Sequence, residues 1–448
     1  MNRLSLITMI ALLLPGITWS QDTLDLSRAV QEALNSNYGI QVAQYNVETA
    51  ETNTFLGATG LLPRVSLTGG ANYNNNNVTA ELVSVDPDTG QPTSEEVSLD
   101  GIQTYGFNTG IGVDYTVFDG LGNMYNYRVL KSNLQLTKEQ TRGVIEGNLA
   151  QVMVAYYQLA RLTLAYELQL EALATSRERL TYIRNQLDFG SATKLFLLNA
   201  QVDLNTDSIT VANAAITVEN ARRDLNVLMG REVEATYAIR TDAQMMNMKP
   251  LPDLQQMALA MNPQLQAADE GRKIAELNIR VAEAARYPRL SVNANYGYNF
   301  SDNGPVSFAR TIQSLGLAAG ANLSFNIFDG NRTSRNIQSA QVGLASSRAQ
   351  YREAEQNLLR DLSKTFATYR NNREILRLNQ TSLEAAQMNF DRTREAFELG
   401  QANSVEFRQA QLNLLLIQNQ LNNIRFDVKL NEIELLRLSG QLSPQPES

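Results

Sequence analysis

The chain of 448 residues contains no cysteine and no histidine. Their absence excludes the Ser-His-Asp triad, the Cys-His pair and any zinc site built from Cys and His ligands. Enzyme chemistry would have to come from carboxylate, lysine or hydroxyl groups. Disulfides are excluded as well, so packing alone must stabilise the chain in an oxidising compartment.

Positive charge and nucleotide-binding motifs are also scarce. The 38 Lys and Arg residues are outnumbered by 46 Asp and Glu, and the net charge of −8 argues against a general affinity for nucleic acid. We find no P-loop and no Gly-rich dinucleotide fingerprint, so no nucleotide hydrolysis is expected. We therefore expect neither an enzyme nor a nucleic-acid-binding protein, and no cofactor or metal site.

Long apolar runs are confined to the N-terminus. Arg3 precedes a mainly apolar run from Leu4 to Ile17, and small residues then occupy Thr18 and Ser20. This order is typical of a secretory signal peptide, with cleavage expected after residue 20. No cysteine stands at the junction, so no lipid anchor is expected. Beyond it we find no uninterrupted apolar stretch of 18 residues, and thus expect no transmembrane helix in the exported chain.

The sequence repeats itself. Pro63-Arg64 recurs 225 positions later as Pro288-Arg289, and Phe118-Asp119-Gly120 recurs 210 positions later as Phe328-Asp329-Gly330. The difference of 15 falls where the first half carries a polar insert, Asn74–Gln103. Such constant spacing predicts an internal duplication.

Each half follows the same order of elements. A helical stretch leads to the Pro-Arg landmark, two alternating segments follow, and a long helical stretch then folds back at a glycine. The expected divisions are a signal peptide at 1–20, a first repeat at 21–230, a linker at 231–250, a second repeat at 251–440 and a polar tail at 441–448. Strands are expected at about 64–74, 104–118, 289–300 and 312–328, and hairpin tips near 190 and 400.

The four alternating segments have the pattern of strands with two different faces. In the first, Val65 and Leu67 share one face while Ser66 and Thr68 share the other. A single strand of this kind would be explained best by a sheet on a soluble core. Four strands of about 10 residues or more, with Asn, Gly and Ser on the polar faces and aromatics near the ends, favour a wall between lipid and water.

Four strands are too few to close a membrane barrel, which needs about eight. An open sheet would leave unpaired backbone groups in lipid, so several chains must share one barrel. Two copies would give about eight strands with a filled interior, whereas three would give about twelve and leave an opening. The small polar faces favour three copies and therefore a homotrimer.

Two long stretches without proline, Leu121–Asp188 and Asn331–Glu398, are 68 residues each and could extend ~100 Å as helices. Apolar residues recur in them every seven positions, which indicates helices that supercoil against neighbours. A plain coiled-coil rod would share this repeat but would not explain the attached strands. The repeating positions are Val152, Leu159, Tyr166, Leu173 and Leu180; Leu362, Tyr369, Leu376, Leu383, Phe390 and Phe397; and Leu414, Leu421, Val428 and Leu435.

Other conspicuous residues have plain structural explanations. The acidic stretch Asp86–Gly90 lacks calcium-loop spacing and is expected to be a mobile turn in a long outer loop over the insert. Acidic side chains on the helices are expected on solvated faces. Methionines between the halves could bind a soft metal, but without Cys or His they are expected to fill gaps in the core. These methionines are Met245, Met246, Met248, Met257 and Met261.

Two glycine turns interrupt the long helices at matching points. Glycine supplies the left-handed backbone at a helix end, and Ser, Thr or Asn can cap the helix that follows. Glu406 and Arg408 lie just past the second turn and could face a lumen or a neighbouring chain, although simple closure of the hairpin explains the turns equally well. The turns comprise Phe189, Gly190, Ser191, Ala192 and Thr193, and Leu399, Gly400, Gln401, Ala402, Asn403 and Ser404.

In order and spacing, these features resemble a TolC-type outer-membrane efflux protein of the outer membrane factor family. The resemblance covers essentially the whole mature chain and rests on the duplicated plan, the strand pairs before each Phe-Asp-Gly turn and the paired glycine hairpins. It implies a mixed α and β fold, in which four transmembrane strands per chain contribute to a trimeric barrel of about twelve strands, surrounded by outer-membrane lipid. The barrel would continue into a long antiparallel α-helical coiled-coil tunnel. The implied location is the outer membrane of a Gram-negative bacterium, with a large periplasmic portion.

The same resemblance implies a passive conduit in a tripartite efflux or type I secretion system, gated at its periplasmic tips. A periplasmic adaptor (membrane fusion) protein would bind the tips, and an inner-membrane RND or ABC transporter would act through the adaptor. The best-known relative narrows its entrance with two rings of aspartate, and the matching positions here are Glu406 and Gln409, beside Arg408. Only the first keeps a carboxylate, which puts strong cation binding at the entrance in doubt.

Other functions stay open at the level of the sequence. A coiled-coil structural protein of the cell envelope, without a transport role, would share the helical repeats. An envelope enzyme would need a converging pair of carboxylates, which we do not find. The exported substrate also stays open among a drug, a metal ion and a polypeptide.

Overall fold

The computed structural model describes residues 23–88, 90–304 and 309–442, so the expected signal peptide and residues 443–448 of the expected tail lie outside the described residues. The chain divides into two compact units. Within the described ranges, the helical unit comprises residues 23–43, 142–262 and 357–442, and the sheet unit comprises the described residues of 44–141 and 263–356.

Helices make up most of the described chain, and α3 and α7 are the longest, with 67 residues each. None of the helices in the described ranges is both long and apolar enough to cross a membrane. The elements in chain order are β1 (Thr23–Leu24), α1 (Leu26–Ser36), α2 (Tyr38–Thr52), the 3-10 helix η1 (Leu56–Thr59), β2 (Arg64–Val85), β3 (Pro92–Phe118), α3 (Gly122–Asp188), α4 (Lys194–Met229), β4 (Ala238–Ile239), α5 (Leu251–Met261), α6 (Pro263–Ala284), β5 (Arg289–Asp302), β6 (Thr311–Ser324), α7 (Arg332–Glu398) and α8 (Ser404–Leu438).

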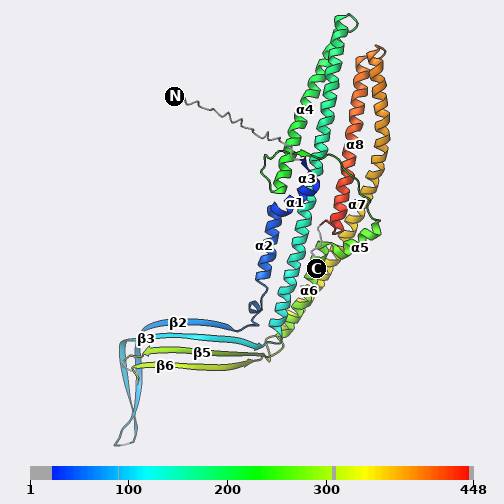
Figure 1. Ribbon diagram of the computed structural model, residues 1–448. Coiled ribbons are helices and arrows are strands. Elements are labelled where there is room, and N and C mark those ends of the chain that lie inside the picture. The colour runs from blue at the N-terminus through cyan, green and yellow to red at the C-terminus, as the bar shows by residue number, and fades with distance from the viewer. Residues whose placement is uncertain (1–22, 89, 305–308, 443–448) are drawn as a thin grey trace, which may run out of the picture. The chain divides into compact units, whose positions relative to one another are not determined.

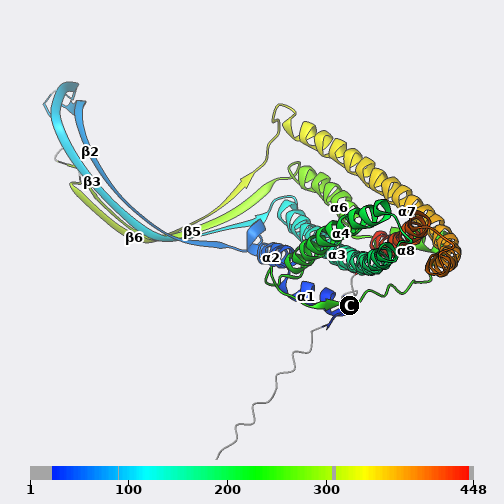
Figure 2. The same ribbon diagram turned by 90° about the horizontal axis from the view of Figure 1, so that it is seen from above.

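The sheet unit is built around one antiparallel sheet with the strand order β2-β3-β5-β6, and its strands curve together (Figures 1 and 2). The register confirms the predicted alternation, because residues of like polarity lie side by side. One apolar row is Leu67, Ile111, Tyr296 and Leu317, and one polar row is Ser66, Gly112, Asn295 and Ala318. In a single chain the apolar face is exposed, with 77% exposure for Leu67 and 71% for Leu317.

Strands β2 and β3 continue past β5 and β6 as a two-stranded ribbon (Figure 1). The ribbon occupies most of the insert Asn74–Gln103, so the expectation of an outer loop there is wrong except for the short turn between the strands. Valines and threonines with high strand propensity continue the pairing through the insert. The register shifts between Asn76 and Val78. Beyond that shift Val78 and Leu99 pair on the face that is polar within the sheet.

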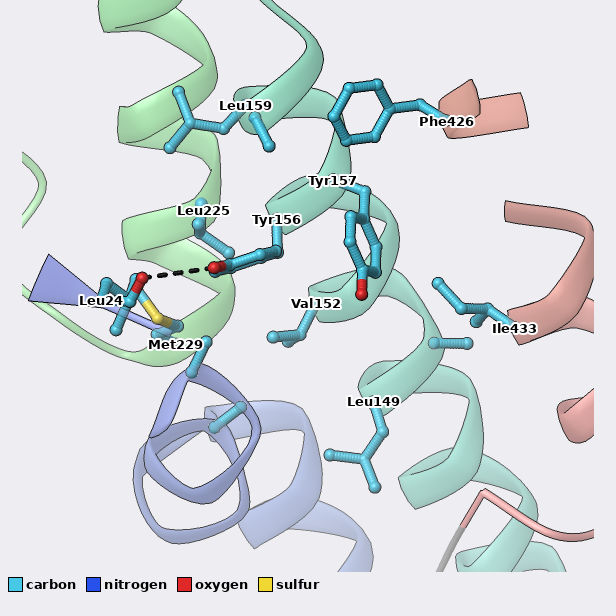
Figure 3. Close-up of a cluster of buried hydrophobic side chains, with 14 of the residues drawn as sticks. Leu24, Leu149, Val152, Tyr156, Tyr157, Leu159, Leu225, Met229, Phe426 and Ile433 are labelled. Carbon is cyan, nitrogen blue, oxygen red and sulfur yellow. Dashed lines mark hydrogen bonds between the residues drawn. The ribbon is translucent and has the colours of Figure 1, made fainter. Parts of the chain in front are cut away.

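The interior of the helical unit confirms the seven-residue seam. Val152 and Leu159 of α3 are fully buried in a cluster that also holds Phe426 of α8 (Figure 3). In the same cluster the Tyr156 hydroxyl donates to the Leu24 carbonyl oxygen at 3.2 Å. Burial raises the pKa of Tyr156 to about 12, so this hydroxyl stays a neutral donor at physiological pH.

Contacts within the helical unit repeat in both halves of the chain. The Asn37 side chain donates to a carbonyl oxygen of α4 at 2.7 Å, and its counterpart Asn262 donates to one of α8 at 3.1 Å. A glycine with positive φ follows each of these two helices: Gly230 is the C-cap of α4, and Gly440 comes directly after Ser439, the C-cap of α8. The duplication read from the sequence is therefore a duplication of packing as well.

Candidate functional site

The polar face of the sheet is lined by asparagines that lie over glycines. A Cβ atom added to Gly106 would come within 2.1 Å of the Asn72 side-chain oxygen, and one added to Gly70 within 2.8 Å of that of Asn108. Any larger residue at these glycines would displace the asparagine carboxamides from their positions over the sheet. The result is a smooth, uncharged and strongly hydrogen-bonding surface.

Charge on this polar face gathers at the end where the strands meet the helices. Arg64 of β2 is the register partner of Asp114 of β3. Arg289 of β5 donates to the Thr116 hydroxyl at 3.1 Å. Two arginines and one aspartate therefore mark this end of an otherwise neutral surface.

The two hairpin tips have the same backbone design. Gly190 and Gly400 adopt φ values of 73° and 72°, and the amides that follow them donate back to Gln186 at 2.8 Å and Ala396 at 2.7 Å. Glycine is favoured here because side chains are strained at positive φ. Beside the glycines, Phe189 is 88% exposed and Leu399 is 66% exposed, so each tip presents an apolar side chain to solvent.

The other predicted tip residues have distinct structural positions. Ser191 donates to the Gln186 carbonyl oxygen at 3.0 Å, whereas Thr193 caps α4 without a side-chain hydrogen bond. Gln401 is exposed and Ser404 is buried. Ala192 and Ala402 pack against a cluster of buried side chains below the tips, which includes Phe390, Phe397 and Phe407.

Glu406 and Gln409 line the same open groove of about 580 Å³, together with Arg392 of α7. The Glu406 carboxylate also accepts from the Asn403 amide at 2.8 Å, while the Asn403 side chain accepts from the Glu406 amide at 3.0 Å. This reciprocal pair is a capping box, which fixes the first turn of α8. Glu406 thus caps α8 and also lines the groove.

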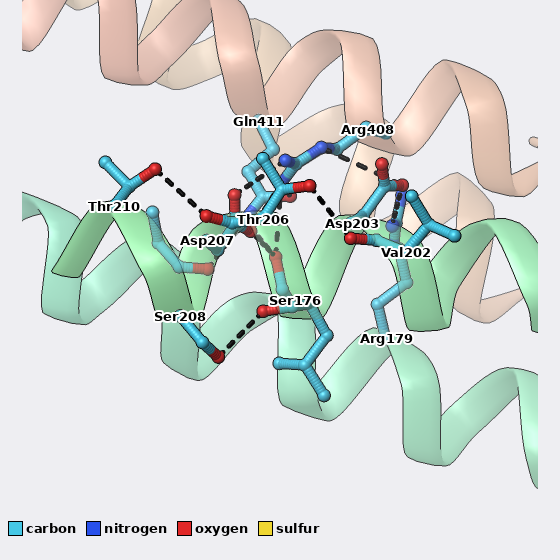
Figure 4. Close-up of polar contacts among 12 residues, drawn as sticks. Ser176, Arg179, Val202, Asp203, Thr206, Asp207, Ser208, Thr210, Arg408 and Gln411 are labelled. Carbon is cyan, nitrogen blue, oxygen red and sulfur yellow. Dashed lines mark hydrogen bonds and ion pairs between the residues drawn. The ribbon is translucent and has the colours of Figure 1, made fainter. Parts of the chain in front are cut away.

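Arg408 does not join Glu406 in that groove but reaches the first hairpin (Figure 4). Its guanidinium donates to both carboxylate oxygens of Asp207 on α4, at 2.8 and 2.7 Å. The Ser176 hydroxyl of α3 donates to the same carboxylate at 2.5 Å, and Gln411 donates to Ser176 at 3.1 Å. One buried network therefore links α3, α4 and α8.

A second arginine completes this network. Arg179 of α3 is 2% exposed, pairs with Asp203 of α4 and donates to the Ser404 carbonyl oxygen at 3.3 Å. Two guanidinium groups therefore pair with two carboxylates. The side chain of Asp203 is 32% exposed, whereas that of Asp207 is 11% exposed, so losing the partner is most costly at Asp207.

Sequence reasoning missed this network because it expected helical carboxylates on solvated faces. That expectation is wrong for Asp207, which is 8% exposed, and for Glu146 and Glu432. Asp203 and Asp207 are four residues apart and so share a helix face, which was the one available signal. The partner arginines lie on other helices, and sequence alone did not give the register between helices.

A further buried ion pair holds the linker between the halves. Lys429 and Glu432 of α8 pair at 2.9 Å, and they bind the linker backbone at the Gln244 carbonyl oxygen (2.7 Å) and the Met246 amide (2.9 Å). In α5, which follows the linker, the Met257 sulfur accepts weak hydrogen bonds from Lys249 and Gln441. In the described ranges no three His, Cys, Asp or Glu side chains are grouped as metal ligands.

Comparison with known proteins identifies the family. A profile of the family described as outer membrane efflux protein matches residues 29–231 and 254–441. The probable outer membrane lipoprotein SilC of Salmonella typhimurium is 23% identical over 93% of this chain and 85% of its own length. The toluene efflux pump outer membrane protein TtgC of Pseudomonas putida is 24% identical, over 93% of this chain and 82% of its own length.

Solved structures show the same fold. A crystal structure of CusC matches with a TM-score of 0.75 and 18% identity, covering 93% of this chain and 92% of that one. The outer membrane channel CmeC of Campylobacter jejuni also has a TM-score of 0.75, with 16% identity over 100% of this chain and 95% of its own. The chain belongs to the outer membrane efflux protein family, a family of channel proteins in the outer membrane of Gram-negative bacteria.

Proposed function

We propose that three copies of this chain share one closed barrel of about twelve strands, which continues into a helical tunnel across the periplasm. The observation that carries the proposal is the four-stranded sheet. It has an exposed apolar face, a polar face whose charges gather at the end next to the helices, and two edge strands, β2 and β6, whose outer sides pair with no other strand among the described residues. Unpaired edges are not tolerated in lipid, so β6 of one copy pairs with β2 of the next.

The number three follows from the polar face. About eight strands enclose a space that side chains fill, whereas about twelve leave an opening. Glycines and flat-lying asparagines, such as Gly106 under Asn72, keep this face thin. They line a water-filled lumen through which cargo passes without covalent chemistry.

The helical tips form the gate of this conduit. Glu406 and Gln409 line the entrance, as their shared groove supports. The buried network around Arg408 and Asp207 holds the second hairpin to the first in the closed arrangement. A periplasmic adaptor opens the entrance by binding the open arrangement more tightly than the closed one.

The adaptor docks on the tips through their exposed apolar side chains, Phe189 and Leu399. An inner-membrane RND or ABC transporter supplies the energy through that adaptor, in an efflux or type I secretion system. The names of two relatives, cation efflux system protein CusC and toluene efflux pump protein TtgC, differ in cargo. A lumen wall that carries charge only at one end suits this range, because it leaves selection to the partners.

Conductance across a planar lipid bilayer tests the proposal. Purified mature protein is expected to give small discrete current steps. Asp207→Asn is expected to enlarge them, because it weakens the link between the hairpins. The matched control Arg377→Gln, which removes an exposed charge on α7, is expected to leave them unchanged. Well-folded protein without conductance, in wild type and variant alike, would favour the structural envelope protein instead.

A further inference from the structure

A cavity of about 490 Å³ lies in the sheet unit where β3 turns into α3 and where α6 ends. Its lining combines three kinds of group: apolar side chains, tyrosines and charged residues. These are Phe118, Leu121, Tyr125, Arg280, Arg286 and Tyr287, with Glu283 beside Arg280.

Gly120 makes this cavity possible. Its φ is 72°, and a Cβ atom there would lie 2.4 Å from the Ala284 carbonyl oxygen and 2.8 Å from the Tyr287 Cβ. The turn after β3 can therefore lie directly on the last turn of α6. The cavity walls are held by main-chain contact and do not depend on the charged side chains.

The cavity begins where the apolar face of the sheet ends. Phe118 is the register partner of Leu290, in the last row of that face, and Leu121 follows it with 48% exposure. If the apolar face meets lipid, as the proposed function requires, the cavity lies at the depth of the headgroups. Tyrosines are enriched at that depth, where an apolar ring meets a polar hydroxyl.

Among the charged side chains that line the cavity, two positive charges face one negative charge. Arg280 and Glu283 pair at 3.0 Å and neutralise each other. Arg286 is exposed, and the ion pairs among the described residues do not include it. A guanidinium in such a place is suited to a phosphate, which it binds through two parallel hydrogen bonds.

The first repeat carries no charged residue at the positions that match these three. At the offset of 225, Arg280, Glu283 and Arg286 correspond to Phe55, Ala58 and Leu61. Leu62 likewise takes the place of Tyr287. These positions are therefore apolar in the first repeat and charged in the second, so the repeated order of elements does not by itself require the charges.

We infer that this cavity binds the headgroup of a phospholipid with one net negative charge, such as phosphatidylglycerol, in the periplasmic leaflet of the outer membrane. Arg286 binds the phosphate, the tyrosine hydroxyls donate to the headgroup, and Phe118 and Leu121 contact the start of the acyl chains. The inference rests on the proposed function of the sheet as a membrane wall. Basic cavities at a membrane surface recognise anionic headgroups in this way.

Native mass spectrometry of the purified protein, released from vesicles of equal phosphatidylglycerol and phosphatidylethanolamine, tests the inference. We expect retained phosphatidylglycerol in preference to phosphatidylethanolamine. Arg286→Leu, which copies Leu61 of the first repeat, is expected to lower retention about tenfold. Arg286→Lys is expected to keep part of it. The matched control Arg335→Leu removes one charge from the first turn of α7, outside the cavity, and is expected to change nothing.

Three outcomes would overturn the inference. Retention that is equal in wild type and Arg286→Leu would mean that the lipid binds elsewhere. Equal retention of both lipids would remove the role of net charge. Displacement of the lipid by inorganic phosphate at millimolar concentration would make the cavity a site for free phosphate. The same spectra give the number of chains, so a failed lipid site in an intact trimer is distinguished from failure of the proposed assembly.

Discussion

The two repeats of this chain keep the same main-chain contacts but differ in their charged side chains. Asn37 and Asn262 each donate to a carbonyl oxygen near a helix end, and we call these two contacts, with the residues around them, the first and the second joint. Next to the first joint Arg231 pairs with Glu32 at 2.6 Å, whereas at the matching positions of the second repeat Gln441 donates to the Met257 sulfur at 3.0 Å. Contacts to the backbone depend on the fold and survive divergence, while pairs of side chains are free to change.

The buried network near the tips follows the same rule. Asp207 and Arg408 join the two hairpins, but their counterparts at the offset of 210 are Ile417 and Leu198. The ion pair thus occurs at one of the two repeat-related pairs of positions, and apolar residues occupy the other. Contacts to the backbone that occur in both repeats are required by the fold, whereas charged side-chain pairs that occur in one repeat are not. Four predictions test this difference.

The largest effect is expected from breaking the network. Arg408→Leu, which copies Leu198, leaves the Asp207 carboxylate buried without its main partner and should destabilise the protein by about 3–5 kcal/mol. The double variant Arg408→Leu with Asp207→Ile should recover most of the loss, since it replaces charges by apolar groups. Urea unfolding in detergent measures both. A double variant no more stable than the single one would show that the charges are required by the fold.

Glycine substitutions should separate the joints from the tips. A Cβ at Gly230 would lie 2.4 Å from the Ser36 carbonyl oxygen, and one at Gly440 2.6 Å from that of Met261. Alanine at either position should cost about 2–4 kcal/mol, from backbone strain and overpacking together. Gly190 and Gly400 have open space around the added atom, so alanine there should cost only the strain, about 1–2 kcal/mol. Equal losses of unfolding free energy at all four sites would contradict this distinction.

Capping should distinguish the two tips from each other. Asn403 accepts from two backbone amides of α8, whereas Thr193 makes no side-chain bond to α4. Asn403→Ala should therefore cost about 1 kcal/mol, and Thr193→Ala much less. Hydrogen exchange should accelerate in the first turn of α8 after the first change and stay constant in α4 after the second. Similar responses at the two tips would remove the difference.

Acid should weaken the first joint and spare the second. Hydrogen bonding from Arg231 holds the pKa of Glu32 below its ordinary value of 4.5, although burial opposes the shift. A lowered folded-state pKa means that this stabilisation is complete above pH 4.5 and is lost as the pH falls through the folded-state value. On acidification, amides around Arg231 should therefore lose more of their protection against exchange, relative to the intrinsic rate at each pH, than those around Gln441. Glu32→Gln should abolish that difference, and its persistence in the variant would refute the assignment.

Much of the fold could be predicted because its signals are local and repeated. The absence of proline and the seven-residue seam through Val152 and Leu159 predicted α3, and alternation around Leu67 predicted β2. The ribbon over the insert was missed because its Asn, Asp and Pro residues are typical of loops, while the cross-strand pairing that stabilises it is not visible in one strand.

The candidate site was predicted less completely. The glycines of the tips could be found because only positive φ explains them at matching points. The role of Arg408 could not, because its partner Asp207 lies 201 positions away on another helix. The pairing of Lys429 with Glu432 was near in sequence, but its burial against the linker depends on packing that sequence does not specify.

The number of chains in the purified protein decides whether the barrel is shared, because the edge strands β2 and β6 of the described sheet have no outer partner within one chain. Native mass spectrometry of the mature protein in detergent counts the chains in the assembly. We expect three chains and no stable single chain. A folded assembly of one or two chains would contradict it, since about eight strands or fewer would leave no lumen for cargo.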